Sequence, residues 1–158
     1  MTELALNQEV AEYLRLAVET TLRDTFNFSV KFEQWSLDKR ALALDASVAC
    51  AVAMTEDNCD RGTLILALSR PAVMKILQTY GIKDTENAAV VNDAVEEITN
   101  MVYGMVKTAL NRRGCRFVMA LPQVLPPTSG GRYADAEKMI MPFTADDHRC
   151  RAVIAVHA

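Results

Sequence analysis

The spacing of apolar residues predicts a helix followed by three strands in the first half of the chain. Residues 8–24 carry an apolar stripe at helical spacing: Val10, Ala11, Leu14, Ala17, Val18, Thr21 and Leu22. Residues 28–32 alternate apolar and polar side chains, which is the period of a half-buried strand. From Leu42 to Met54 large side chains alternate with small ones, which predicts a long strand closely covered on both faces. Residues 63–68 form a third predicted strand after turn chemistry at 58–62.

The second half repeats this order after a short helix, which has Pro71 in its first turn and Gly81 at its end. A long helical pattern covers residues 86–113 and stops at Gly114. Three predicted strands follow, at 117–125, 138–143 and 149–157. Residues 126–131, with the sequence PPTSGG, show neither a helical nor a strand signal, so we expect a mobile loop there.

These elements predict an α+β fold with a largely antiparallel six-stranded sheet and two long helices packed across it. Strands joined by short turns pair antiparallel, and the helices bury their apolar stripes on the sheet. Because helix-plus-three-strands occurs twice, a pseudo-duplicated chain is expected to show approximate two-fold symmetry. The length of 158 residues suits a single domain over residues 1–158.

Composition narrows the classes of function. The chain has 17 basic and 20 acidic residues, a net charge of −3, and no basic run longer than Arg112-Arg113, so nucleic acid is not the expected partner. Apolar stretches such as 46–54 are shorter than the roughly 20 residues that span a bilayer, and Glu3 stands where a signal peptide is basic. We therefore expect a cytoplasmic protein with no membrane association. The four cysteines form no Cys-x-x-Cys pair, so we expect packing thiols and no metal site.

The long helix has an unusual outward face. On a helical wheel centred on Asn100, six residues fall within about 60°, namely Asp93, Glu96, Glu97, Gly104, Lys107 and Asn111. The opposite side carries Val91, Val95, Ile98, Val102, Met105 and Ala109. Glu97 and Asn100 are neighbours at i, i+3, whereas Asn100 and Gly104 each weaken a helix relative to Ala.

Three interpretations of this face are open from the residues themselves. The acidic side chains are compatible with an ordinary solvated surface. Gly104 suits either a close crossing by a second helix of the same molecule or a bare patch on which a partner docks. In each case a residue with no side chain sits one turn beyond Asn100.

At this helix the sequence resembles a known family. Glu97-Ile98-Thr99-Asn100 with the trailing Gly104 is similar to the Glu-x-x-Asn signature of the CheC/CheX/FliY chemotaxis phosphatases, and the single copy resembles CheX. Strand matches occur at residues 62–66, 121–124 and 140–143, and the resemblance spans roughly residues 40–156. The last turn departs from it, because Asp146-Asp147-His148 stands where the family often has Gly.

The resemblance implies a phosphatase that hydrolyses the aspartyl phosphate of a CheY-like response regulator. Asn100 would position the attacking water and Glu97 would pair with a Lys of the regulator, both as catalytic residues. Partner-binding roles fall to Asp93, Glu96, Gly104 and Lys107, with Lys107 at the rim or structural. Glu96 is the rival of Glu97 at i, i+4 from Asn100. No cofactor is implied beyond Mg²⁺ on the partner.

The resemblance also implies a homodimer formed through an edge strand, since unpaired strand edges favour such joining. In the first helix Glu9 and Glu12 stand at the positions equivalent to Glu97 and Asn100, so a second site would lack its amide. The alternative function is a non-catalytic adaptor or assembly module of the same fold, because fold alone does not determine activity. A stand-alone metabolic enzyme is disfavoured, since no nucleophile elbow, P-loop or dinucleotide motif occurs.

Overall fold

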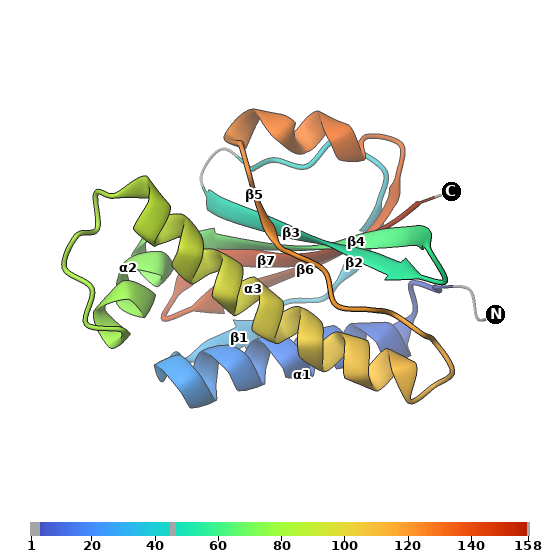
Figure 1. Ribbon diagram of the computed structural model, residues 1–158, viewed down its shortest axis with the longest axis horizontal. Helices are drawn as coiled ribbons and strands as arrows, with labels where there is room; N and C mark the ends of the chain where they lie inside the picture. Colours follow the sequence, from blue (N-terminus) through green and yellow to red (C-terminus); the bar gives the residue numbers. More distant parts are fainter. Residues whose placement is uncertain (1–3, 45–46, 158) are drawn as a thin grey trace.

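The computed structural model describes residues 4–44 and 47–157 (Figure 1). Its helical elements are α1 (Gln8–Thr20), the π-helical turn η1 (Thr21–Thr25), α2 (Arg70–Thr79), α3 (Ala88–Asn111) and the 3-10 helix η2 (Pro127–Tyr133). Its strands are β1 (Val30–Phe32), β2 (Ser36–Asp38), β3 (Ser47–Glu56), β4 (Cys59–Ser69), β5 (Gln123–Leu125), β6 (Glu137–Ala145) and β7 (His148–Val156). The predicted helices and most predicted strands are therefore confirmed, within a few residues at their ends. Residues 45 and 46 of the strand expected at 42–54 lie outside the described part.

The strands form one antiparallel sheet in the order β1-β6-β7-β4-β3-β5. The short strand β2 also pairs with β6, beyond the end of β1, so these two strands share one edge. Each half contributes a first strand that crosses over to pair with the second strand of the other half: β1 with β6, and β5 with β3. From either edge inward, the sheet therefore has the first strand of one half, then the second and third strands of the other half. This equivalence confirms the predicted α+β fold and its pseudo-two-fold arrangement.

Two matching hairpins mark the two halves. Asp57 and Asn58 connect β3 to β4 with φ of 51° and 62°, and Asp146 and Asp147 connect β6 to β7 with φ of 48° and 67°. Positive φ at both central residues is the geometry of a two-residue type I′ turn, and Asn and Asp tolerate it better than other non-glycine residues. The Asp146-Asp147 pair thus fulfils the requirement of the turn without glycine.

The main core lies between one face of the sheet and the helices α1, α2 and α3 (Figure 1). It contains Leu14, Val18, Leu22, Ile76, Val95, Ile98, Val102, Val106, Cys50, Val52, Met54, Leu64, Leu66, Leu68, Met139, Phe143 and Ile154. Each fully buried large aliphatic side chain contributes roughly 1.5–3 kcal/mol to folding. This packing holds α3 against the sheet along its length and leaves its other side outward.

The opposite face of the sheet carries a smaller core under η2. Its members are Leu42, Leu44, Ala49, Ile65, Ala67, Leu125, Tyr133, Val153 and Ala155. The expectation of a loop at 126–131 was wrong: residues 127–133 form η2, and a Cβ on Gly130 would lie 1.8 Å from the Leu42 carbonyl oxygen. Leu42 N–H also donates to the Gly130 carbonyl, at 3.1 Å. Close backbone contact, which the sequence pattern does not record, orders this Pro- and Gly-rich segment.

The strand expected at 117–125 is the main correction to the fold. Only Gln123–Leu125 pairs with β3, and Phe117 makes an isolated bridge with Glu56. Pro122 has no N–H to give to a ladder, which helps to end β5 at Gln123. Residues 115–122, here called the return segment, instead run back along α3.

Among residues 4–44 and 47–157, no helix combines the length and apolar character needed to cross a membrane. Cys50, Cys115 and Cys150 are buried as expected for packing thiols, whereas Cys59 is exposed. Within the same described ranges, no three His, Cys, Asp or Glu side chains gather in a way that would hold a metal ion.

Candidate functional site

The helix α3 is fixed at both ends by its own sequence. The Asn87 side chain caps its start by accepting hydrogen bonds from the N–H groups of Ala89, at 3.0 Å, and Val90, at 3.4 Å. Gly114, with φ of 105°, follows its end, where Cys115 N–H donates to the Leu110 carbonyl at 3.2 Å. The 24-residue helix therefore presents one continuous outward side, here called the α3 ridge, which carries Glu97, Asn100 and Gly104.

The buried stripe of α3 is rotated from the predicted one. Its buried residues are Ala94, Val95, Ile98, Thr99, Val102, Tyr103, Val106 and Leu110. Their mean direction lies about 40° from the position opposite Asn100, on the Tyr103 side of the helix. Met105, expected in the core, is 37% exposed. Two polar residues enter the core because their hydroxyls are satisfied: Thr99 donates to the Val95 carbonyl at 2.8 Å and Tyr103 to the Val118 carbonyl at 2.6 Å.

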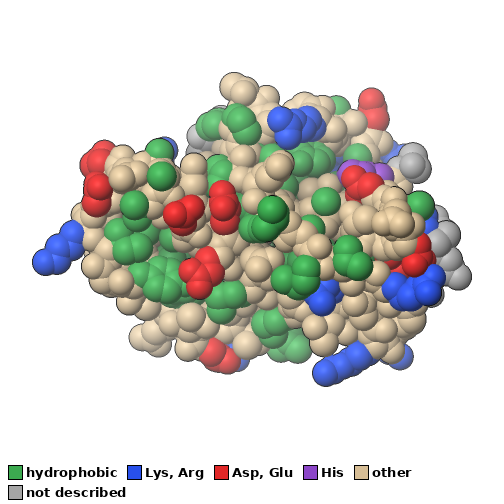
Figure 2. Space-filling view, viewed as in Figure 1, with side chains coloured by type: hydrophobic (Ala, Val, Ile, Leu, Met, Phe, Trp, Pro, Cys, Tyr) green, Lys and Arg blue, Asp and Glu red, His purple; other side chains and the backbone are tan. Residues whose placement is uncertain are grey.

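This rotation sets the exposure of the predicted site residues. Asp93 and Glu97 are exposed, whereas Glu96, Asn100, Gly104 and Lys107 are half-buried. All six remain on the outward side of α3, and Gly104 and Glu97 lie nearest its middle. Acidic side chains are visible among apolar ones along this face in Figure 2, with several Lys and Arg side chains toward its right-hand end.

Asn100 stands at the edge of the ridge with an unused acceptor. Its Oδ1 atom is shielded from solvent and accepts no hydrogen bond from any described residue. A shielded acceptor without a donor costs about 1–3 kcal/mol, so this arrangement is unfavourable unless a donor is supplied from outside. Because Oδ1 is shielded, a donor from another molecule reaches it only when the Asn100 amide turns outward on its side chain.

Gly104 leaves an open gap one turn beyond Asn100. A Cβ built on Gly104 meets no atom within 4 Å, apart from the backbone of its own helix. A close crossing by a second helix of the same molecule, which was one of the open interpretations, is therefore wrong. The bare patch faces outward, where another molecule has access to it.

Glu97 is accompanied by Tyr80 from the end of α2. The Tyr80 ring packs edge-on against Phe26, with centroids 5.5 Å apart and planes at 79°. Burial raises the pKa of Tyr80, and the nearby carboxylate of Glu97 raises it further. Tyr80 was not predicted as a site residue. The only sequence signal for it is its place beside Gly81, where α2 ends.

The rivals Glu96 and Glu97 face different surroundings. The charge of Glu96 acts on Cys50 of β3, whose pKa is raised to about 11, first by burial and also by this carboxylate. Glu96 thus lies toward the sheet, whereas Glu97 is exposed beside α2. Of the two, Glu97 is the one presented outward.

Asn111, at the end of the same stripe, has a structural role. Its Nδ2 donates to the Phe117 carbonyl at 2.9 Å and its Oδ1 accepts from Phe117 N–H at 2.8 Å.

The equivalent face of α1 is also occupied. Glu9 pairs with Arg113 at 3.0 Å, and Glu12 pairs with Arg15 at 3.0 Å.

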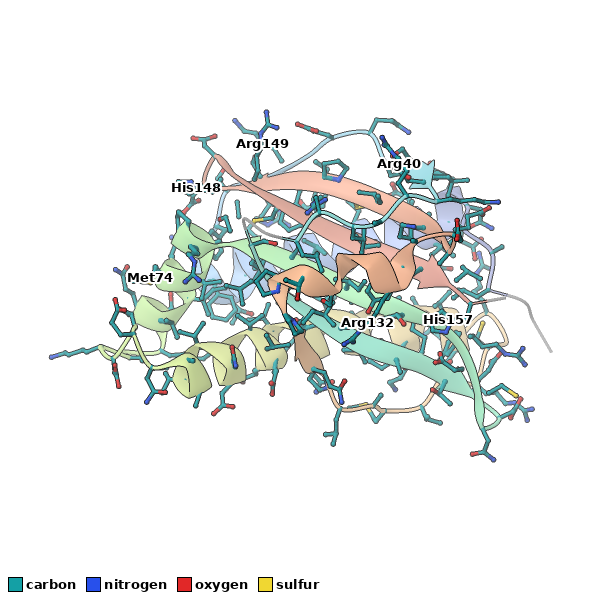
Figure 3. All side chains as sticks on the ribbon, turned by 90° about the horizontal axis from the view of Figure 1, so that it is seen from above. Arg40, Met74, Arg132, His148, Arg149 and His157 are labelled. Carbon is teal, nitrogen blue, oxygen red and sulfur yellow. The ribbon has the colours of Figure 1, made fainter. Side chains whose placement is uncertain are left out.

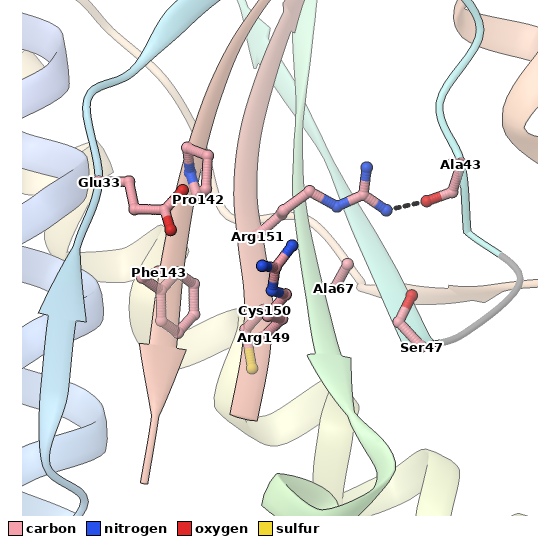
Figure 4. Close-up of a pocket in the computed structure, with 9 residues that line it drawn as sticks. All are labelled: Glu33, Ala43, Ser47, Ala67, Pro142, Phe143, Arg149, Cys150 and Arg151. Atoms are coloured by element: carbon pink, nitrogen blue, oxygen red, sulfur yellow. Dashed lines mark hydrogen bonds between the residues drawn. The ribbon is translucent and has the colours of Figure 1, made fainter. Parts of the chain in front are cut away.

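A cavity of about 430 Å³ opens elsewhere, at the sheet surface away from α3 (Figure 4). Arg149 and Arg151 of β7 border it together with Glu33, and the Arg151 guanidinium donates to the Ala43 carbonyl. Figure 3 shows Arg40 and Arg149 on the side of the sheet away from α3. Cys150 also lines the cavity, but burial raises the pKa of this thiol, which disfavours a thiolate nucleophile. The chemistry suggested by the sequence therefore lies on a convex helix.

An outward Glu-x-x-Asn helix on a pseudo-symmetric antiparallel sheet is the arrangement expected of a chemotaxis phosphatase. The family model for the chemotaxis phosphatase CheX matches residues 48–144, and the chain belongs to this family. No curated protein matches the chain significantly.

Solved structures of similar fold agree with this assignment. A CheC-like superfamily protein from Shewanella sp. PV-4 is 24% identical with a TM-score of 0.78, covering 97% of this chain and 100% of that one. CheX from Vibrio vulnificus is 22% identical with a TM-score of 0.77, covering 94% and 99%. A third structure, of Borrelia burgdorferi CheX in complex with CheY, BeF3 and Mg²⁺, is 18% identical with a TM-score of 0.70, covering 93% and 96%.

Proposed function

We propose that this protein hydrolyses the aspartyl phosphate of a CheY-like response regulator by placing the α3 ridge against the regulator's phosphorylation site. One observation carries the proposal: Asn100 holds an unsatisfied amide oxygen between the exposed Glu97 and the open gap at Gly104. Membership of the CheX family and the similarity to a CheX protein solved with CheY support this choice of partner.

The reaction needs a positioned water more than a strong base. Water attacks phosphorus in line with the aspartyl oxygen, the P–O bond to that oxygen breaks, and the carboxylate leaves with the bonding electrons. The proton of the water passes to the departing phosphate or to solvent. Once the Asn100 side chain has turned outward, its Oδ1 accepts a hydrogen bond from this water and so directs the lone pair of the water at phosphorus, while the neutral amide avoids repulsion by the phosphoryl group. Such positioning lowers the barrier by several kcal/mol, on the order of 10²- to 10³-fold in rate.

Glu97 has a different task, because a carboxylate is repelled by the phosphoryl dianion. It pairs with a Lys ammonium of the regulator and thereby fixes the approach of the whole helix. Tyr80 lies beside this carboxylate, where its hydroxyl can restrain it. Asp93 and Glu96 add negative potential, which attracts basic side chains of the regulator around its phosphorylation site. Lys107 lies at the margin of the docking surface. The missing side chain of Gly104 gives the regulator close access to the backbone of α3.

The remaining parts of the proposal concern the assembly. Mg²⁺ is supplied by the regulator, where it neutralises charge on the phosphoryl group. A homodimer through an edge strand and a cytoplasmic location stay predictions. The outer edges of the sheet, β1 with β2 on one side and β5 on the other, offer backbone groups for such pairing.

The test follows phosphate loss from phosphorylated regulators in the presence of this protein. Wild type should accelerate the loss, and Asn100→Ala should remove most of the acceleration while the affinity for the regulator changes little. Glu97→Ala should weaken both the acceleration of phosphate loss and the affinity for the regulator. Asn92→Ala, a half-buried amide on the same helix, is the matched control and should behave as wild type. If the regulator binds but decays at its own rate, the protein is a non-catalytic adaptor.

A further inference from the structure

The return segment presents a run of exposed apolar side chains next to the α3 ridge. Val118 is 52% exposed, Met119 62% and Leu121 89%. Single exposed apolar residues are common on protein surfaces and need no explanation. Three large ones within four consecutive residues form a continuous apolar strip, and we use this name for Val118, Met119 and Leu121 together.

The backbone of this strip is held in place. Val118 N–H donates to the Thr55 carbonyl at 3.0 Å, and the Val118 carbonyl accepts from the Tyr103 hydroxyl at 2.6 Å. At the other end, Val124 is aligned with Cys50 in the pairing of β5 with β3. Because both ends are fixed, the side chains are displayed without further ordering of the chain, which reduces the entropy cost of binding.

These same contacts locate the strip beside Asn100. Its start is bonded to Tyr103, the neighbour of Gly104, while β5 pairs with β3 at Cys50 and also contacts α3. Residues 119–122 therefore pass along the stretch of α3 that carries Asn100, as the orange trace beside α3 shows in Figure 1. Asn100 therefore has Glu97, near the middle of the ridge, on one side and the apolar strip on the other.

We propose that the apolar strip is the second part of the docking surface for the phosphorylated receiver domain, which it contacts through an apolar patch beside the phosphorylation site. This inference rests on the proposed function. Continuity with the ridge selects this occupant, since a receiver seated on Asn100 and Gly104 covers the adjoining strip. The strip does not touch the reacting atoms, so it stabilises the bound ground state and the transition state equally. It sets KM and leaves kcat unchanged.

The experiment uses the full chain with Met119→Ser and Leu121→Ser combined. Affinity is measured with a receiver carrying beryllofluoride as a stable phosphoryl mimic, and KM and kcat are measured with the phosphorylated receiver. The expected result is a rise of about 10-fold in Kd and KM with kcat within about 2-fold of wild type. Leu37→Ser is the matched control, because Leu37 is 50% exposed on β2 at the far edge of the sheet.

The outcomes separate the inference from the proposed function. Unchanged Kd and KM in the double variant overturn the inference and leave the phosphatase intact. A change from dimer to monomer with unchanged KM overturns it as well, because the strip is then covered by a second copy. Binding that the double variant weakens, without any wild-type acceleration of phosphate loss, supports the docking surface and refutes the phosphatase. Absence of wild-type binding refutes both.

Discussion

The Tyr103 hydroxyl donates a 2.6 Å hydrogen bond to the Val118 carbonyl oxygen and so joins α3 to the return segment. Burial raises the pKa of Tyr103 to about 12, so the phenol stays protonated and able to donate well above neutral pH. This bond helps fix the spacing between α3 and the return segment, which lie side by side at the candidate site. It links the stability of the fold to the shape of the surface that a partner would meet.

Tyr103→Phe is expected to lower the free energy of unfolding by about 1–2 kcal/mol, because a partly buried hydrogen bond is lost while the ring is kept. It should also raise KM for the receiver, since Val118 is no longer held. Urea unfolding and steady-state kinetics measure the two effects. Tyr133→Phe, in the smaller core on the other face of the sheet, is the control and should leave KM unchanged. Normal stability in Tyr103→Phe would show that the bond contributes little.

Tyr80→Phe tests the restraint on Glu97. The ring keeps its edge-on contact with Phe26, so stability should change by less than about 0.5 kcal/mol. Loss of the hydroxyl frees the Glu97 carboxylate, and kcat/KM should fall by about 2- to 5-fold, which corresponds to roughly 0.5–1 kcal/mol. The decisive comparison is with Glu97→Ala as background. If Tyr80 acts through Glu97, Tyr80→Phe has no further effect there, whereas an equal effect in both backgrounds refutes the role.

Asp146 predicts a pH dependence of stability. Its carboxylate accepts from Lys75 at 2.6 Å and from Ser29 N–H at 2.8 Å, and these interactions hold its pKa below the usual value of 3.8. A depressed folded pKa gives stability that is present above the unfolded pKa and is lost as pH falls through the folded pKa. Both side chains are partly exposed, so the effect is on the order of 0.5 kcal/mol.

The matched variant is Asp146→Asn, which keeps an acceptor and tolerates the positive φ of this turn position. Wild type should be slightly more stable than the variant at pH 7, and the two should converge at acid pH below the folded pKa of Asp146. Unfolding by urea across this range measures the difference. A constant difference at all pH values would exclude the carboxylate as its source.

Local periodicity was sufficient for much of the fold. The stripe at 10–22 predicted α1, and a turn was expected at 58–62, although the hairpin turn is Asp57-Asn58 and residues 59–62 belong to β4. Elements whose partners are near in sequence leave a readable pattern, because their side chains alternate with the period of the element. The repeated order of helix and strands was likewise sufficient to predict the symmetric sheet.

The failures share a physical cause, which is contact between segments without a periodic signal. Residues 117–121 read as a strand, yet side chains of α3, Tyr103 and Asn111, hold this backbone. This bond satisfies the hydroxyl of the buried Tyr103, and the buried stripe includes the Tyr103 side of the helix, so Asn100 is half-buried and not fully outward. The Pro-Gly segment becomes helical through the backbone of Leu42. Such contacts depend on the assembled sheet.

Gly104 allows stability and activity to be separated in a single substitution. Gly104→Ala should raise the free energy of unfolding by about 0.5–1 kcal/mol, because Ala is the better helix former and its Cβ meets no atom within 4 Å. If a regulator docks against this bare stretch, the added methyl group intervenes, so KM should rise in Gly104→Ala and rise further in Gly104→Leu.

The control is Gly131→Ala in η2, where an added Cβ also meets no atom within 4 Å. It lies on the opposite face of the sheet and should leave the kinetics unchanged. Urea unfolding and phosphate-release kinetics on the same preparations give both readouts. A variant at Gly104 that is more stable and equally active would show that the regulator does not approach the helix there. The combination of higher stability and weaker docking instead identifies Gly104 as a residue kept for access and not for folding.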